Sequence, residues 1–103
     1  RTGAMMPQGA PPVVVRYIVP EDGDELEHPN VLHVRRTGDG NSTTLGELRK
    51  VWPLPGSYHF RVQRKLAEVY GGMLVWLDVR DDAMELPLCS DGSVLAKVSR
   101  ISS

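Results

Sequence analysis

The chain has 103 residues, of which 41% are hydrophobic and 24% are charged, and its 12 basic and 13 acidic side chains give a formal net charge of −1. This length suits a single domain, and the near-neutral charge argues against generic nucleic-acid binding and against a polybasic membrane anchor, both of which need an excess of basic residues. The single cysteine, Cys89, has no partner for an internal disulfide, which favours a reducing compartment.

The chain begins with a stretch that is rich in glycine and proline. Residues 1–12 lack hydrophobic periodicity, and we expect them to form a flexible N-terminal segment. We interpret residues 1–5 as a cloning remnant, and we place the folded domain at residues 13–103.

Two strands are predicted in the first third of the chain. Residues 13–19, VVVRYIV, are β-branched and aromatic and lie between two prolines, which is typical of a strand. An acidic turn, EDGDE, follows, and residues 30–36, NVLHVRR, predict a second strand. Alternation along this strand separates two sets of side chains: Leu32 and Val34 on one face, and Val31, His33 and Arg35 on the other. We expect Val34 to lie in the core, together with Leu26 from the preceding turn.

A short helix is predicted after a loop at residues 37–42, TGDGNS. Thr44 and Glu47 have the form of a capping box, with Thr at the N-cap and Glu three residues later. Pro53 and Pro55 then end the helix, because proline cannot continue the hydrogen-bond pattern. About two turns result, with apolar residues at helical spacing: Leu45, Leu48, Val51 and Trp52.

Three further strands are predicted at residues 58–63, 73–79 and 94–101, each rich in β-branched or aromatic residues. The stretch KLAEVYGG before the fourth strand fits either a long hairpin arm or a loop. Residues 81–88 fit either a short helical turn or a loop. The order ββαβββ predicts an α+β fold of the ubiquitin-like β-grasp roll type, with a five-stranded mixed sheet and one short helix.

No group of residues has the pattern of an enzyme or of a metal site. The spacing of His28, His33 and His59 fits no zinc motif, and Cys89 has no near partner. Asp81 and Asp82 are neighbouring acids without a nucleophile or a base set against them. We therefore expect no catalysis, no cofactor and no bound metal.

Two stretches resemble a known family. The first is Leu26-Glu27-His28-Pro29, just before the second strand. The second is Val75-Trp76-Leu77-Asp78-Val79, followed by acidic residues, by Pro87 and by Val94-Leu95. Together they are similar to the DIX-like domain of the SOSEKI family of plant polarity proteins, which resembles the DIX domains of Dishevelled and Axin. The resemblance spans about residues 13–101. Arg16 departs from it, because the family pattern has a tyrosine at this position.

The resemblance implies a roll with the sheet order 2-1-5-3-4 that self-associates head to tail into filaments and scaffolds cell-polarity or signalling assemblies. The second and fourth strands are then free edges, and the second strand of one copy pairs with the fourth strand of the next. The expected interface residues on the second-strand edge are Leu32, His33, Val34, Arg35 and Arg36. On the fourth-strand edge they are Val75, Trp76, Leu77, Asp78, Val79, Asp81 and Asp82.

The resemblance also implies the kind of partner. The chain is expected to bind copies of itself and other DIX-like domains, and to reach membranes only through other regions or partners. The near-neutral charge is the reason to expect that it binds no nucleic acid. Its expected location is the cytoplasm, polarised at the cell periphery in the full-length protein.

Charge placement suggests that Arg35 and Arg36 pair with Asp78, Asp81 or Asp82 of the next copy. Two other functions stay open. One is a PB1-like oligomerisation domain, which would use a lysine in the first strand against an acidic loop, where this chain has Arg16. The other is a monomeric ubiquitin-like module that binds a peptide along one sheet edge.

Overall fold

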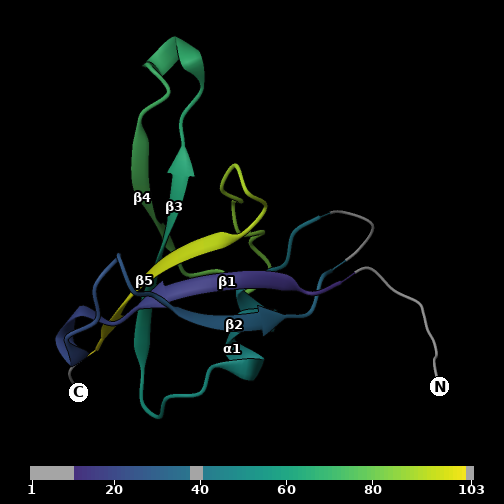
Figure 1. Cartoon of the computed structure of the whole chain (residues 1–103). Coiled ribbons are helices and arrows are strands. Elements are labelled where there is room, and N and C mark those ends of the chain that lie inside the picture. The colour runs from purple at the N-terminus through teal and green to yellow at the C-terminus, as the bar shows by residue number, and fades with distance from the viewer. Residues whose placement is uncertain (1–10, 38–40, 102–103) are drawn as a thin grey trace.

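The structure of the chain is a computed structural model, and it describes residues 11–37 and 41–101 (Figure 1). The predicted flexible segment at residues 1–12 therefore lies outside the described residues, apart from Pro11 and Pro12. Residues 38–40 of the predicted loop also lie outside them.

One five-stranded sheet and one helix make up the fold. The strands lie in the order β2-β1-β5-β3-β4; β1 is parallel to β5, and the other neighbours are antiparallel. This mixed sheet with one short helix is the predicted α+β ubiquitin-like roll. The elements are β1 (Val13–Ile18), the 3-10 turn η1 (Pro20–Asp22), β2 (Asn30–Val34), α1 (Leu45–Val51), β3 (Tyr58–Lys65), the 3-10 turn η2 (Glu68–Tyr70), β4 (Leu74–Val79) and β5 (Val94–Arg100).

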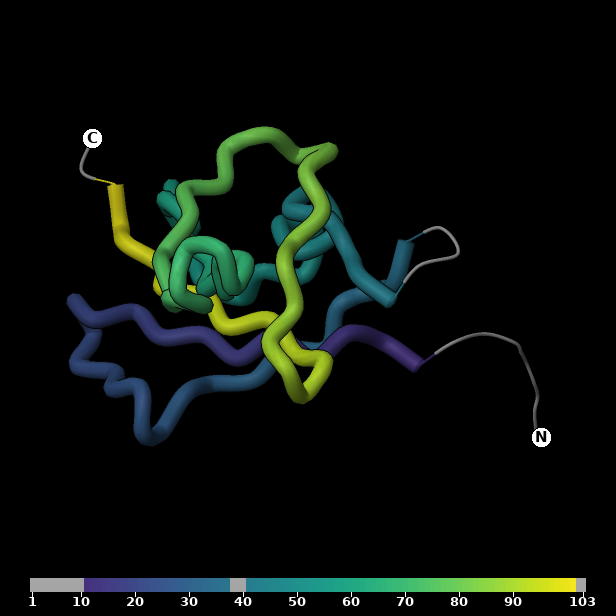
Figure 2. Tube along the Cα trace, turned by 90° about the horizontal axis from the view of Figure 1, so that it is seen from above, coloured from purple at the N-terminus to yellow at the C-terminus, as the bar shows by residue number. Residues whose placement is uncertain are grey.

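The β3–β4 hairpin is a long arm that projects from the roll, with η2 at its tip (Figure 1). The stretch KLAEVYGG is therefore part of a hairpin arm and not a loop, because β3 continues to Lys65 and η2 makes the turn. The connection between β4 and β5 contains a turn but no helix. Seen from above, it starts on the side of the view away from β1 and β2 and then runs across the view toward β1 (Figure 2).

The helix α1 begins as predicted at Thr44, whose side chain accepts a hydrogen bond from the Glu47 backbone N–H at 3.3 Å. The Glu47 carboxylate does not complete the capping box and instead binds Lys50 at 3.1 Å. The β4–β5 connection is tied to the start of the helix, because the Leu45 backbone N–H donates to the Met84 carbonyl at 3.1 Å. The buried side chains of Leu45 and Leu48 pack α1 against one face of the sheet.

Buried apolar side chains from every strand and from α1 form one core beneath this face. Val34 is fully buried as expected, but Leu26 is not a core residue, since 48% of it is exposed in the turn before β2. The core residues are Val13, Val15, Tyr17, Val19, Val34, Leu45, Leu48, Tyr58, Phe60, Val62, Val79, Leu86, Val94, Ala96 and Val98.

Candidate protein interface

The two outer strands of the sheet, β2 and β4, lie at its opposite edges. Each has a strand neighbour on one side only, β1 for β2 and β3 for β4. Among the described residues, no loop backbone hydrogen-bonds to the outer side of either strand. Such an edge presents unpaired N–H and C=O groups to a further strand. The fold therefore leaves two free edges at the places where the sequence predicted them.

The β2 edge exposes part of the predicted set of side chains. His33 and Arg35 are exposed, and Leu32 is half-buried. Val34 is in the core, so it presents only its backbone at the edge. Arg36 folds back, because its Nε donates to the Pro11 carbonyl at 2.9 Å and its Nη1 donates to Asn41 Oδ1 at 3.3 Å. Both arginines follow the last residue of β2 rather than lying within the strand.

The β4 edge is less apolar on its surface than its sequence suggests. Val75, Trp76 and Leu77 are half-buried, and Val79 lies in the core with 1% of its surface exposed. Trp76 lies on the face of the sheet opposite α1, where the Lys97 ammonium is 5.6 Å from the centre of its ring. Val79 can therefore contribute only backbone groups to a partner.

The acidic side chains near β4 already bind cations of their own chain. Asp78 Oδ1 accepts from Arg61 Nε at 3.0 Å, across the β3–β4 pair. The same oxygen lies 3.4 Å from His59 Nε2, and the other carboxylate oxygen lies 3.9 Å from Arg80 Nη2. These internal pairs reduce what Asp78 offers to a basic partner.

Asp81 and Asp82 also make contacts within the chain. Asp82 Oδ1 accepts from Arg49 Nε at 2.9 Å, and Asp81 Oδ1 accepts from the Ala83 backbone N–H at 2.9 Å. Both residues are exposed and both follow β4. The structure thus brings the three predicted acids to the end of β4. Two of them, Asp78 and Asp82, each bind an arginine of a neighbouring element.

Exposed apolar residues that the sequence reasoning missed lie at the beginnings of the two edge strands. Val31, the second residue of β2, is 53% exposed, and Leu74, the first residue of β4, is 59% exposed. Leu74 belongs to a group of exposed side chains at the end of the arm, here named the apolar tip: Val69, Tyr70, Met73 and Leu74. The signal for the tip is the pair of apolar residues on each side of Gly71 and Gly72, which the sequence analysis placed in KLAEVYGG and in the fourth strand but not in the interface.

Other exposed charges near the edges are unpaired. Among the described residues, no ion pair includes any of five charged side chains: Glu25 and Glu27 in the turn before β2, Arg35 after β2, and Arg64 and Lys65 at the end of β3. These groups are available to a partner without breaking an internal contact.

Within residues 11–37 and 41–101, no group of histidine, cysteine and acidic side chains is arranged to hold a metal ion. In the same part of the chain, no helix has the length and apolar character required to cross a membrane.

Comparison with known protein families finds one match. The family model described as DIX domain matches residues 12–98, a span that runs from the start of β1 to within two residues of the end of β5. Comparison with the curated proteins finds no match. The matched span includes both free edges, the arm and the acidic end of β4.

Proposed function

Because the chain belongs to the DIX domain family, whose members are protein-interaction domains that self-associate and bind other DIX domains in signalling, we propose that it assembles head to tail into filaments through β2 and β4. One observation carries this proposal. The same sheet has two free edges on opposite sides, and each edge exposes a large apolar side chain, Val31 on one and Leu74 on the other.

Edge pairing of this kind extends a sheet from one molecule into the next. The two surfaces that meet are different, so the contact does not close on itself and generates an open chain of copies. A joint formed by one strand pair and a few side chains buries little area, and we expect an affinity of about micromolar. Assembly then depends on local concentration.

A filament of such copies displays many identical binding surfaces. Weak binding of a second protein to each copy becomes strong overall when many copies lie in one chain. The proposed role is therefore a concentration-dependent scaffold for cell-polarity or signalling assemblies. Within the DIX family the chain is proposed to be of the SOSEKI type, on the basis of Leu26-Glu27-His28-Pro29 before β2 and the Val75–Val79 segment. The proposed location is the cytoplasm, at the cell periphery.

The PB1-like alternative would use a lysine of the first strand, and this chain has Arg16 there. Arg16 is engaged within the chain, because its Nε donates to Ser93 Oγ at 3.0 Å. Substitution of Arg16 should therefore affect folding stability, whereas substitution of Arg35 should affect assembly. A chain of constant mass at all concentrations would favour the monomeric peptide-binding module.

The test uses two variants, Val31→Asp and Leu74→Asp, each of which places a carboxylate on one exposed edge. Sedimentation of the unsubstituted chain should show a mass that rises with concentration, and each variant alone should be monomeric. A mixture of the two variants should form a heterodimer, because each retains one intact edge. Val51→Asp is the matched control, since Val51 is an exposed valine outside both edge strands, at the end of α1.

Circular dichroism of each variant checks that loss of assembly is not loss of fold. Both substituted residues are more than half exposed, so we expect the folded spectrum to be retained. The assignment of β2 and β4 as the assembling edges would be wrong if both variants, Val31→Asp and Leu74→Asp, assembled like the unsubstituted chain.

A further inference from the structure

A groove lies where α1 ends and β3 begins, at the end of the β3–β4 hairpin opposite the apolar tip (Figure 1). We propose that this groove binds an extended peptide segment of a partner protein, in which an apolar side chain is flanked by acidic residues. The inference concerns a surface other than the outer sides of β2 and β4. It does not depend on head-to-tail assembly, so either proposal can fail without the other.

Two adjoining cavities make up the groove. Their volumes are about 410 and about 340 Å³, and sites that bind ligands commonly measure about 300–1,000 Å³. Arg49, Tyr58 and Ile101 line both cavities, so the two form one continuous groove. A groove made of two cavities in a row suits an extended chain better than a compact small molecule.

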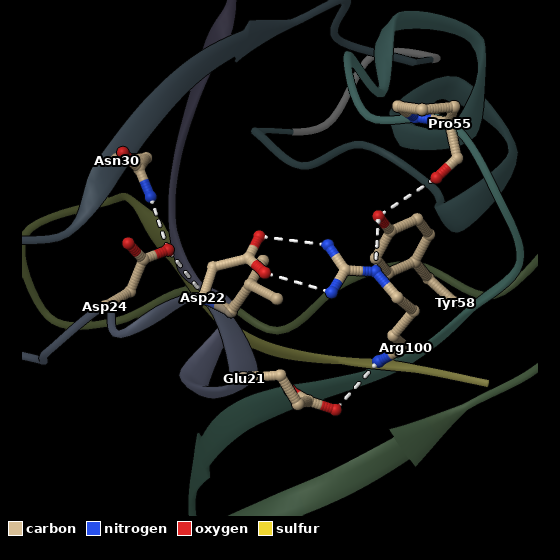
Figure 3. A network of polar contacts seen from close by, with 8 residues as sticks. Glu21, Asp22, Asp24, Asn30, Pro55, Tyr58 and Arg100 are labelled. Atoms are coloured by element: carbon tan, nitrogen blue, oxygen red, sulfur yellow. Dashed lines mark hydrogen bonds and ion pairs between the residues drawn. The ribbon is translucent and has the colours of Figure 1, made fainter. Parts of the chain in front are cut away.

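The first cavity is the apolar end of the groove. The Trp52 ring lies 5.4 Å from the Tyr58 ring and 5.2 Å from the Phe60 ring, and Ile101 beside them is 52% exposed. The Tyr58 hydroxyl donates to the Pro55 carbonyl at 3.0 Å, which holds the turn after α1 in place (Figure 3). An apolar side chain that enters this cavity removes exposed carbon from water, and the wall that receives it is already formed.

The indole N–H of Trp52 favours a ligand that carries a peptide backbone. Its Nε1 atom is buried and has no hydrogen-bond partner within the described part of the chain. Folded proteins leave few buried polar groups unpaired. Because Trp52 lines the first cavity, a peptide carbonyl bound there is the acceptor that this N–H group lacks. A purely apolar ligand would leave the N–H group unpaired.

Arg49 selects a carboxylate next to the apolar side chain. Its guanidinium carbon lies 5.3 Å from the centre of the Phe60 ring, and its Nε donates to Asp82 Oδ1 at 2.9 Å. Among the described residues, these contacts leave both Nη groups of Arg49 without an acidic partner. A guanidinium held in this way can bind a carboxylate through two parallel hydrogen bonds.

Arg80 supplies a second cation at the other end of the groove. Its side chain is 79% exposed, and its contact with Asp78 is long, at 3.9 Å. Among the described residues, the two cavities are lined by two arginines, one histidine and no acidic residue. Complementary charge across an interface selects the partner. The ligand therefore carries carboxylates beside its apolar side chain.

Nuclear magnetic resonance with a defined peptide tests the site. The probe is Asp-Glu-Leu-Glu-Asp with blocked termini, whose side chains read the same in both chain directions. The chain has two tryptophans, so the Trp76 indole signal is an internal control. The peptide should shift the Trp52 indole signal and leave the Trp76 signal in place. The Leu74→Asp variant is used for the spectra to limit assembly, and fluorescence anisotropy of the labelled peptide measures its affinity for the unsubstituted chain.

Matched peptides and variants separate the groove from general charge attraction. Asn-Gln-Leu-Gln-Asn and Asp-Glu-Gly-Glu-Asp should each bind at least about fivefold more weakly, because one lacks the charges and the other lacks the apolar side chain. Arg80→Glu should weaken binding of the acidic peptide by about fivefold or more. Arg64→Glu makes the same change of charge at the end of β3 away from the groove, and it should change binding by less than about twofold.

Three results would overturn the proposal. The first is a Trp52 signal that does not move at about 1 mM peptide, where even a weak site begins to fill. The second is equal binding of the neutral peptide, which would indicate a site for apolar ligands. The third is equal weakening by Arg80→Glu and Arg64→Glu, which would indicate attraction to the net charge alone. Each of these results would leave the proposed head-to-tail assembly untouched.

Discussion

Arg100 at the end of β5 and Asp22 in η1 face each other through two parallel contacts, Nη1 to Oδ1 at 2.9 Å and Nη2 to Oδ2 at 3.0 Å (Figure 3). The Arg100 backbone N–H also donates to Glu21 Oε2 at 3.0 Å, and Arg100 Nε donates to the Tyr58 hydroxyl at 3.3 Å. The hydrogen bonds to Asp22 and Tyr58 raise the pKa of Arg100 above its ordinary value. This cluster ties the end of the central strand to the segment that leads into the β2 edge.

The variant Asp22→Asn should loosen that segment. The amide cannot accept two charge-assisted hydrogen bonds from the guanidinium, and planar two-point pairing is the strong form of this contact. We expect a lower melting temperature, faster amide hydrogen exchange over residues 20–30 and weaker assembly through β2. Thermal denaturation and exchange measurements test the expectation. Lys50→Gln, in an exposed helix pair, is the control that should change the melting temperature little. An unchanged exchange rate over residues 20–30 would contradict the role given to the Asp22 contact.

Most of the fold was predictable because its signals are local. The capping position of Thr44, the prolines after α1 and the alternation in each strand act over a few residues, and the structure has a helix and five strands where these patterns lie. The sequence does not decide between an arm and a loop for KLAEVYGG, because this stretch has neither helical nor strand periodicity. Its conformation depends on the pairing of β3 with β4, and cross-strand register is a tertiary property.

The candidate site was predicted less completely, since burial depends on packing between distant elements. Val34 and Val79 lie in the edge strands as expected, yet both side chains are in the core. Val79 partners Phe60 across the β3–β4 pair, and both side chains belong to the core, where the Phe60 ring lies 5.2 Å from the Trp52 ring. Leu26 was expected in the core and is exposed. The sequence also could not predict that Arg61 of β3 binds Asp78 and that Arg49 of α1 binds Asp82, because these residues meet only in the tertiary fold.

The turn at the end of the arm gives a prediction about Gly72. This residue has φ +64°, a left-handed conformation that costs a residue with a Cβ atom about 1–2 kcal/mol. A Cβ at this position would also lie 2.7 Å from Glu68 Oε2, although the flexible Glu68 side chain can move. Gly72→Ala should therefore distort the turn that carries the apolar tip and weaken assembly. Concentration-dependent sedimentation measures the effect. Gly72→Asn should be milder, because asparagine adopts this conformation more readily; equal assembly by all three chains would contradict the prediction.

We expect assembly to depend only modestly on salt, because two acidic side chains near β4 are already paired within their own chain. Asp78 and Asp82 bind Arg61 and Arg49 of their own chain, so an incoming copy adds few new ion pairs. Exposed pairs are screened by salt and contribute about 0–1 kcal/mol each. We expect the association constant to fall by less than about tenfold when salt rises from about 0.05 to about 0.5 M. Light scattering across a salt series measures this. A fall of several hundredfold would instead indicate that charge pairs dominate the joint.

We expect the stability of the folded chain to fall at acidic pH in part because of Asp91. The Ser93 hydroxyl and the Ser93 backbone N–H donate to Asp91 Oδ1 at 2.7 and 3.0 Å, and these hydrogen bonds lower the pKa of Asp91 below the ordinary value of 3.8, with Arg16 acting in the same direction. A carboxyl group whose pKa is lower in the folded than in the unfolded state stabilises the fold fully above the unfolded value. That contribution is lost as the pH falls through the folded value.

The matched variant is Asp91→Asn, which keeps the Oδ1 acceptor for Ser93 but removes the charge. At pH 7 the variant should melt at a lower temperature than the unsubstituted chain. Below pH 3.8 the difference should shrink, because the protonated carboxyl of Asp91 then resembles the neutral amide. Thermal denaturation of both chains between about pH 7 and about pH 2 measures the convergence. A difference in melting temperature that stays constant through this range would show that the Asp91 charge does not stabilise the fold.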